Sequence, residues 1–333
     1  MRIKQPTLII LLLISFSITQ AQEVIDNRPQ YMDSIKNSEW PYKLPVWGKK
    51  VTKRGVDFPY PMGVMINGMI ASQEVTVKDL KVGVNDGDMA PLEFIKFGET
   101  KANLNVLNAR IDVWAIPFLD FYVIAGRTWA ETSVSLVAPV QFSSTVNFSG
   151  NTVGAGVTFG GRYKEIFGTI DYNHTWTYFE EIQGAIHTQM VSPRIGHIFQ
   201  ARRKPDRNVG LWVGANGIFL NNTTEGAINM GDLGVNGQIA DFDIENTDWY
   251  QNLGPAQKVV VKQIADKIKD KLSGIDVSDT TIHYSLKKRP ISSWSMSVGG
   301  QYQFNHNWQM RTEFGFLGGR KSVLASLNYR FGF

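Results

Sequence analysis

Several charged residues stand two positions apart inside segments that are otherwise largely apolar. Arg110 precedes Asp112 in this way, and Arg311 precedes Glu313. Residues two apart in a strand project from the same face, so these charges would share the polar face that points into the lumen of a barrel. The candidates on such faces are five arginines and three acids: Arg110, Asp112, Arg162, Asp171, Arg194, Arg311, Glu313 and Arg330. An excess of arginine lining a pore favours anions, whereas arginines matched with acids form ion pairs that fill a narrow interior. Both interpretations stay open.

Patterns for catalysis or metal binding are absent from the sequence. The five histidines are scattered, and Asp171 and His174 would point to opposite faces of a strand. There is no HExxH, GxSxG or phosphate-binding glycine loop, and a chain without cysteine has neither disulfides nor thiolate metal ligands. We therefore expect no catalytic residue, metal or cofactor. A Ser, His and Asp brought together from different loops stays open as an enzymatic alternative.

The elements that carry the charged residues are long segments in which apolar and polar residues alternate. In the last segment every odd-numbered residue from Val323 to Phe333 is apolar, while Ser326, Asn328 and Arg330 lie between them. Alternation of this kind is the signature of a strand with one apolar face. Ten such strands are predicted, over 62–71, 103–116, 119–130, 153–163, 166–178, 185–199, 208–221, 293–304, 308–316 and 322–333.

The connections between these strands alternate between short and long. Short turns are expected at 117–118, 164–165, 200–207 and 305–307, and the longest loop covers 222–290. An even strand count puts every short turn on one side, which is typical of a closed antiparallel transmembrane β-barrel. The sequence thus predicts an all-β barrel of about ten strands, with twelve as the alternative count. A soluble secreted β-sandwich is the competing architecture, but its strands would be shorter and its loops would not sort by side.

The N-terminal part of the chain differs from the rest. Residues 1–21 have a basic start, an apolar run over 8–18 and small residues before position 22, as a cleaved signal peptide does, and the run is short for a membrane-spanning helix. Residues 22–60 contain four prolines and are predicted to form an irregular periplasmic segment, followed by the barrel over 61–333. The formal net charge of +4 falls to +2 once Arg2 and Lys4 are removed (32 basic against 30 acidic residues), which is too weak to indicate a nucleic-acid partner.

One helix is predicted in the longest loop, over 255–272. Apolar residues recur there every four positions, with lysines on the remaining surface, Pro255 near the start and Gly274 past the end. Such a basic amphipathic helix could lie on anionic lipopolysaccharide or over the barrel mouth, or it could pack on neighbouring loop residues.

The chain also resembles a known group of proteins. Its last eight residues, SLNYRFGF, look like the terminal signal that the barrel-assembly machinery reads, which points to Tyr329, Phe331 and Phe333. The segments at 58–64, 107–126, 151–161, 191–199 and 308–320 are similar to a group of uncharacterised outer-membrane β-barrel proteins of Gram-negative bacteria. The resemblance implies residence in the outer membrane after export, with membrane lipid and lipopolysaccharide as neighbours. It carries over no catalytic residues and no oligomeric state.

Two classes of function fit these expectations. One is a narrow channel or transporter for small solutes or lipids. The other is a closed barrel whose loops act as an enzyme, adhesin or structural element.

Overall fold

The computed structural model describes residues 25–84, 89–91, 96–138, 142–180, 184–220, 223–229, 244–246, 248–252, 254–255, 258, 262, 266 and 281–332. The predicted signal peptide and Phe333 lie outside these residues. Within 255–272 the described residues Pro255, Lys258, Lys262 and Asp266 are helical, and the rest of that predicted helix lies outside the described part.

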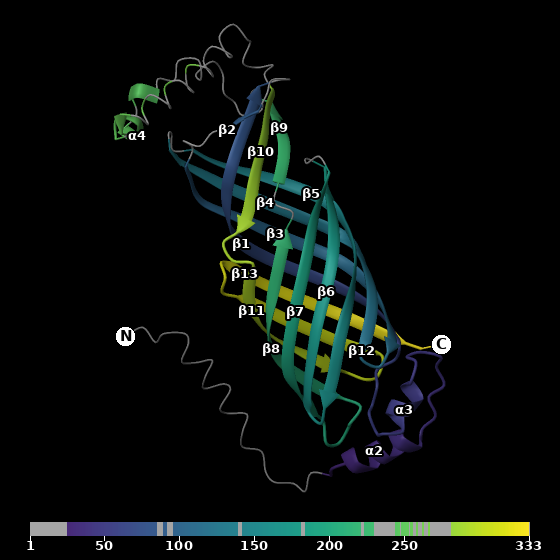
Figure 1. The fold of residues 1–333 in the computed structure, drawn as a ribbon. Coiled ribbons are helices and arrows are strands. Elements are labelled where there is room, and N and C mark those ends of the chain that lie inside the picture. The colour runs from purple at the N-terminus through teal and green to yellow at the C-terminus, as the bar shows by residue number, and fades with distance from the viewer. Residues whose placement is uncertain are drawn as a thin grey trace, which may run out of the picture.

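Ten antiparallel strands close into a barrel (Figure 1). They are β1 (Met62–Val84), β3 (Lys96–Ile116), β4 (Leu119–Ala138), β5 (Phe142–Tyr163), β6 (Ile166–Phe179), β7 (Ala185–Gln200), β8 (Asn208–Leu220), β11 (Trp294–Gln303), β12 (Trp308–Phe316) and β13 (Arg320–Phe331). The first and last strands pair from Met62–Phe331 to Gln73–Arg320, which closes the ring. The prediction of a ten-stranded closed barrel is confirmed, and the alternative count of twelve is wrong.

Three further strands extend one side of the barrel beyond this ring. From Val75 onward, β1 no longer pairs with β13 but with β10 (Thr281–Pro290). Strand β10 in turn pairs with β9 (Thr223–Asn229). The short strand β2 (Ala90–Pro91) also pairs with β1. The strands β1 and β3–β5 are 20 to 23 residues long, whereas β11–β13 are 9 to 12, so the wall is much taller on one side.

The side chains of the wall sort by face as the alternation requires. On β13 Val323 and Leu327 are nearly half exposed, while Ser326, Asn328 and Arg330 between them are 4–6% exposed. The apolar residues therefore point outward, and the polar residues fill the inside. This is the reverse of a soluble protein, and it is stable only where hydrocarbon replaces water around the barrel.

The N-terminal segment is not irregular throughout, so that prediction is wrong over two ranges. It contains helix α2 (Arg28–Asn37) and the short helix α3 (Gly48–Thr52). Pro29 lies in the first turn of α2, where a proline has no hydrogen bond to lose, so it begins the helix rather than breaking it. Both helices lie beside the end of the barrel where the C-terminus is found (Figure 1). Among the described residues of the long loop are a 3₁₀ turn (Ile244–Asn246) and helix α4 (Asp248–Gln251).

No helix within the described ranges is both long and apolar enough to cross a membrane.

Candidate functional site

Arg110 is the centre of one group of buried charges inside the barrel. Its Nη2 lies 2.5 Å from Asp120 Oδ2, its Nη1 3.5 Å from Asp171 Oδ2 and its Nε 3.8 Å from Asp112 Oδ1. Its guanidinium also lies 3.6 Å from the centre of the Tyr122 ring. One cation thus holds carboxylates from three strands, which a rigid planar donor group is suited to do.

Asp112 and Asp171 link this group to other strands. Asp112 accepts a hydrogen bond from Arg330 Nη2 at 2.9 Å, across the β1 seam. Asp171 accepts hydrogen bonds from the hydroxyl groups of Tyr122 and Thr158, both at 2.7 Å. Both oxygens of Asp171 are thus hydrogen-bonded, as burial of a charge requires, whereas Asp112 Oδ1 and Asp120 Oδ1 have no hydrogen-bond partner among the described residues.

A second group surrounds Glu313 on β12. Arg194 Nε and Nη2 bind the two carboxylate oxygens at 2.7 and 3.2 Å, a bidentate geometry. Trp212 Nε1 donates to the same carboxylate at 3.0 Å, and Asn216 donates at 3.4 Å. Arg311 lies nearby with its guanidinium 5.4 Å from the Trp212 ring, and it donates to Gln301 at 3.2 Å.

We name these two groups together the charged layer. It consists of four cations and four anions: Arg110, Asp112, Asp120, Asp171, Arg194, Arg311, Glu313 and Arg330. Seven of the eight residues singled out from the sequence lie in it. The exception is Arg162, which is exposed at the short-turn rim and donates to the Lys164 carbonyl at 2.5 Å.

Asp120 is the member that the sequence reasoning missed. It is 2% exposed and carries the shortest ion pair of the layer. Its neighbours Leu119, Phe121 and Val123 are apolar, so the alternation already placed Asp120 on the inner face. With Asp120 included and Arg162 at the rim, the charged layer has four cations and four anions, and Arg320 of β13, which donates to Met69 Sδ at 3.9 Å, is a further cation outside it.

Polar but uncharged residues line the same strands on the long-loop side of the charged layer. The hydroxyl groups of Thr128, Thr152 and Thr177 form a chain with oxygen–oxygen distances of 2.8 and 2.9 Å. Asn67 donates to Asn108 at 2.8 Å in the next strands of the wall. We name these five residues the hydroxyl layer.

The described N-terminal residues 25–60, here called the cap, are attached to the short-turn end of the barrel. Their backbone bonds reach three places on it: Asn27 N donates to Arg202 O at 2.9 Å, Val46 N donates to Ala115 O at 2.8 Å, and Tyr60 O accepts from Arg330 Nε at 2.9 Å. The last bond ties the cap directly to the charged layer.

A polar cluster and aromatic rings complete the attachment of the cap. Asp57 accepts from the Tyr31 hydroxyl at 2.7 Å and lies 3.2 Å from His306 Nε2, in the turn between β11 and β12. The hydrogen bond to Asp57 raises the pKa of His306 above its usual value. Phe58 packs edge-on against Trp114 at 5.5 Å.

No cluster of His, Asp and Glu suited to a metal ion occurs among the residues that the structure describes. The buried charges and polar groups form a network of ion pairs and hydrogen bonds that links strands of the wall to one another.

Comparisons with known proteins give structural likeness only. No family model matches the chain, and no curated protein matches it. Among solved structures, the outer membrane protein OprG of Pseudomonas aeruginosa aligns at 9% identity and a TM-score of 0.37, over 82% of this chain and 98% of that one. The β domain of the Bordetella autotransporter BrkA aligns at 7% identity and 0.37, over 81% and 100%, and the Ralstonia pickettii toluene transporter TbuX at 9% and 0.31, over 82% and 90%.

The class of the protein follows from its own geometry rather than from these alignments. A closed ring of ten antiparallel strands with an apolar exterior and a polar interior defines a transmembrane β-barrel.

Proposed function

We propose that this protein is an outer-membrane channel for small polar solutes that the N-terminal cap closes reversibly. The observation that carries the proposal is the cap itself. It is attached to the short-turn end by hydrogen bonds to Arg202, Arg203, Ala115, His306 and Arg330. These contacts lie at strand ends and short turns, so a segment held by them can be released without unfolding the barrel.

The lining of the lumen indicates which solutes would pass. The charged layer has equal numbers of cations and anions, so its field gives little preference for either sign of charge. The hydroxyl layer offers donors and acceptors without charge. We therefore expect uncharged or zwitterionic solutes rather than anions.

The proposal includes the route to the membrane. Residues 1–21 would direct export, and Tyr329, Phe331 and Phe333 would be read by the barrel-assembly machinery. Lipopolysaccharide would then surround the long-loop side. Recovery of the protein in the outer-membrane fraction, with faster gel migration before boiling than after, would support this part.

The second candidate is a closed barrel whose function lies in its loops. The observation in its favour is the charged layer, because each carboxylate in it is bound by at least one arginine. A network of that kind can fill a ten-stranded barrel permanently.

A reversible disulfide between cap and wall separates the two candidates. The chain has no cysteine, so Val46→Cys with Ala115→Cys creates a single possible bridge. The two residues are joined by a backbone hydrogen bond from Val46 N to Ala115 O, and disulfides span Cα atoms that lie about 4.4–6.8 Å apart. Each single-cysteine variant serves as a control.

The channel proposal expects planar bilayers with the oxidised double variant to be silent, and discrete conductance steps to appear on reduction. The single variants should conduct in both conditions. Folded protein that stays silent after reduction, and also when residues 25–60 are deleted, would contradict the channel and leave the loops as the functional part.

A further inference from the structure

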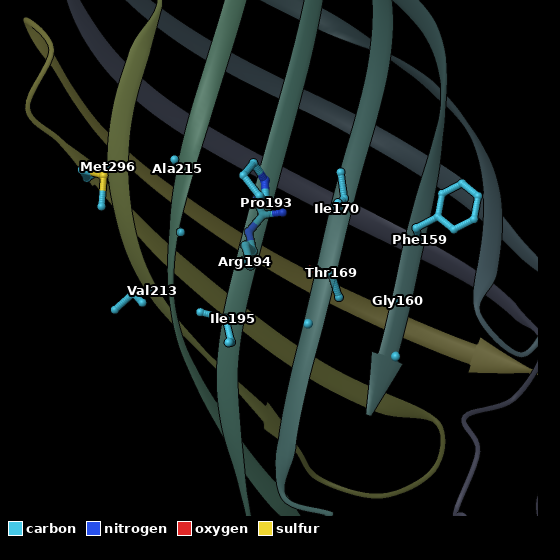
Figure 2. Close-up of a pocket in the computed structure, with 13 residues that line it drawn as sticks. Phe159, Gly160, Thr169, Ile170, Pro193, Arg194, Ile195, Val213, Ala215 and Met296 are labelled. Atoms are coloured by element: carbon cyan, nitrogen blue, oxygen red, sulfur yellow. The ribbon is translucent and has the colours of Figure 1, made fainter. Parts of the chain in front are cut away.

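An apolar groove of about 670 Å³ crosses the outer face of the wall on β5, β6, β7, β8 and β11. Figure 2 shows Phe159, Ile170, Ile195, Val213 and Met296 projecting from these neighbouring strands. The five side chains are 43–60% exposed, so they border the groove without filling it. Neither α4 nor the cap is among the residues that line it.

Two glycines deepen the groove, although neither the backbone conformation nor the packing requires glycine at these positions. A β-carbon at Gly161 would have no neighbour within 4 Å, and one at Gly168 would meet only the Arg194 carbonyl at 3.9 Å. Neither glycine has a positive φ. Glycine weakens a strand, and where nothing else requires it, it often marks a place where another molecule approaches closely.

The groove also runs over an interruption in the wall. The pairing of β7 with β8 has no residue pair between Val191–Gly217 and Arg194–Gly214, and this gap contains Pro193. Proline has no amide hydrogen to donate, and it is rare in the middle of a sheet. The flat proline ring and the neighbouring Ala215 keep the floor of the groove shallow and apolar.

The rim beneath the groove is basic. The end of β5 and the two short turns that join β5 to β6 and β7 to β8 carry six exposed cations: Arg162, Lys164, Arg202, Arg203, Lys204 and Arg207. The acids in these turns are Glu165 and Asp206, and the nearby Asp26 is paired with Arg28 at 2.5 Å. Within the described chain, none of the six cations forms an ion pair.

The distance between groove and rim matches one leaflet of a bilayer. Five residues separate Ile170 from Glu165, which is about 16 Å along a strand and about 12 Å along the membrane normal at the usual barrel tilt. Half of the hydrocarbon core measures about 15 Å. A lipid chain lying in the groove would therefore have its headgroup at the basic rim.

We propose that this sector binds a membrane phospholipid with an anionic headgroup, in the leaflet on the short-turn side. The acyl chain lies over Gly161, Gly168 and Pro193, and the phosphate lies among the arginines and lysines of the two turns. The proposal requires membrane residence but not conduction, so a silent channel would not affect it.

The test is native mass spectrometry of the full chain in detergent with dioleoyl-phosphatidylglycerol, compared with dioleoyl-phosphatidylcholine. We expect the anionic lipid to bind at one preferred site and the zwitterionic lipid to bind more weakly. Changing Arg202, Arg203 and Lys204 to Gln should weaken phosphatidylglycerol binding by about fivefold for each cation removed. Changing Lys49, Lys50 and Lys53 of the cap, which are equally exposed, should leave it unchanged.

The groove is tested by Gly161→Leu with Gly168→Leu, which should abolish the preferred site while the barrel still folds. Gly68→Leu is the matched control, because Gly68 of β1 also has no neighbour within 4 Å of an added β-carbon. Four outcomes would overturn the proposal. The first is that the two lipids bind equally well, and the second is that Gly68→Leu loses as much phosphatidylglycerol binding as the groove variant. The third is that inorganic phosphate alone displaces the lipid, and the fourth is that the protein forms a dimer that dissociates in the groove variant. The last would make a second copy of the chain the occupant.

Discussion

The charged layer and the hydroxyl layer occupy the same lumen, but they depend on different contacts. In the charged layer, Arg194 and Glu313 are 119 residues apart and meet across the interior, so removing either leaves a buried charge. In the hydroxyl layer, Thr128, Thr152 and Thr177 come from three adjacent strands and bond only to neutral groups. The charged layer therefore links strands that are not neighbours in the barrel, whereas the hydroxyl layer links only adjacent strands of the wall.

The largest expected effect comes from Glu313→Gln in the charged layer. The amide keeps the shape and can still accept from Trp212, but Arg194 and Arg311 lose the negative charge between them. Removing one partner of a buried pair costs about 3–5 kcal/mol, and we expect a loss of that size in the free energy of unfolding, measured by urea titration in lipid vesicles.

Glu99→Gln is the control for that measurement, because Glu99 pairs with Lys101 at an exposed position. It should change the free energy of unfolding by less than about 0.5 kcal/mol. Equal effects of the two substitutions would show that the charged layer is hydrated like a surface.

A smaller effect is expected from Thr152→Val in the hydroxyl layer. The substitution keeps the shape and removes the hydroxyl that joins Thr128 to Thr177, so it should cost about 0.5–1.5 kcal/mol. Thr145→Val, at an exposed hydroxyl pair with Ser133, is the matched control in the same titration. A loss as large as that of Glu313→Gln would remove the distinction between the layers.

The smallest effect concerns the cap and depends on pH. The pKa of His306 is raised in the folded protein, so protonated His306 stabilises cap attachment most below its ordinary pKa of about 6.5. That contribution is lost as the pH rises through the folded value. Asp57, Tyr31, Tyr60 and Asp206 are the titratable groups that face the imidazole.

The protection of residues 25–60 from hydrogen exchange, measured relative to the intrinsic exchange rate at each pH, should accordingly be greater in acid than in alkali. His306→Gln should flatten that dependence after correction for the intrinsic exchange rate. A pH profile that the substitution leaves unchanged would place the sensitivity of the cap elsewhere.

Much of this architecture could be predicted from the sequence, and the reasons for the misses are physical. Alternation determines which face of a strand each side chain takes, and Arg110, Asp112 and Arg330 lie on the inner face of the wall. Alternation does not determine how the strands are aligned with one another around the ring, so it does not predict that Arg194 pairs with Glu313. Asp120 was overlooked beside a turn although its alternation was clear. The helix at Arg28–Asn37 was missed because Pro29 was interpreted as a breaker of structure rather than a first-turn residue.

The pairing of β1 with β13 has a consequence for how the chain reaches this form. Met62 and Phe331 are 269 positions apart (331 − 62), so the seam joins nearly the two extremes of the wall. Until that junction forms, both strands present a row of unpaired amides and carbonyls, which invite pairing with other chains. The entropy cost of joining distant segments grows only slowly with their separation along the chain. The risk of pairing with other chains therefore depends on how long the two strands stay unpaired during folding, rather than on the stability of the closed barrel. Closure of the ring is therefore all-or-none, because losing the pairing of β1 with β13 exposes the edges of both strands at once.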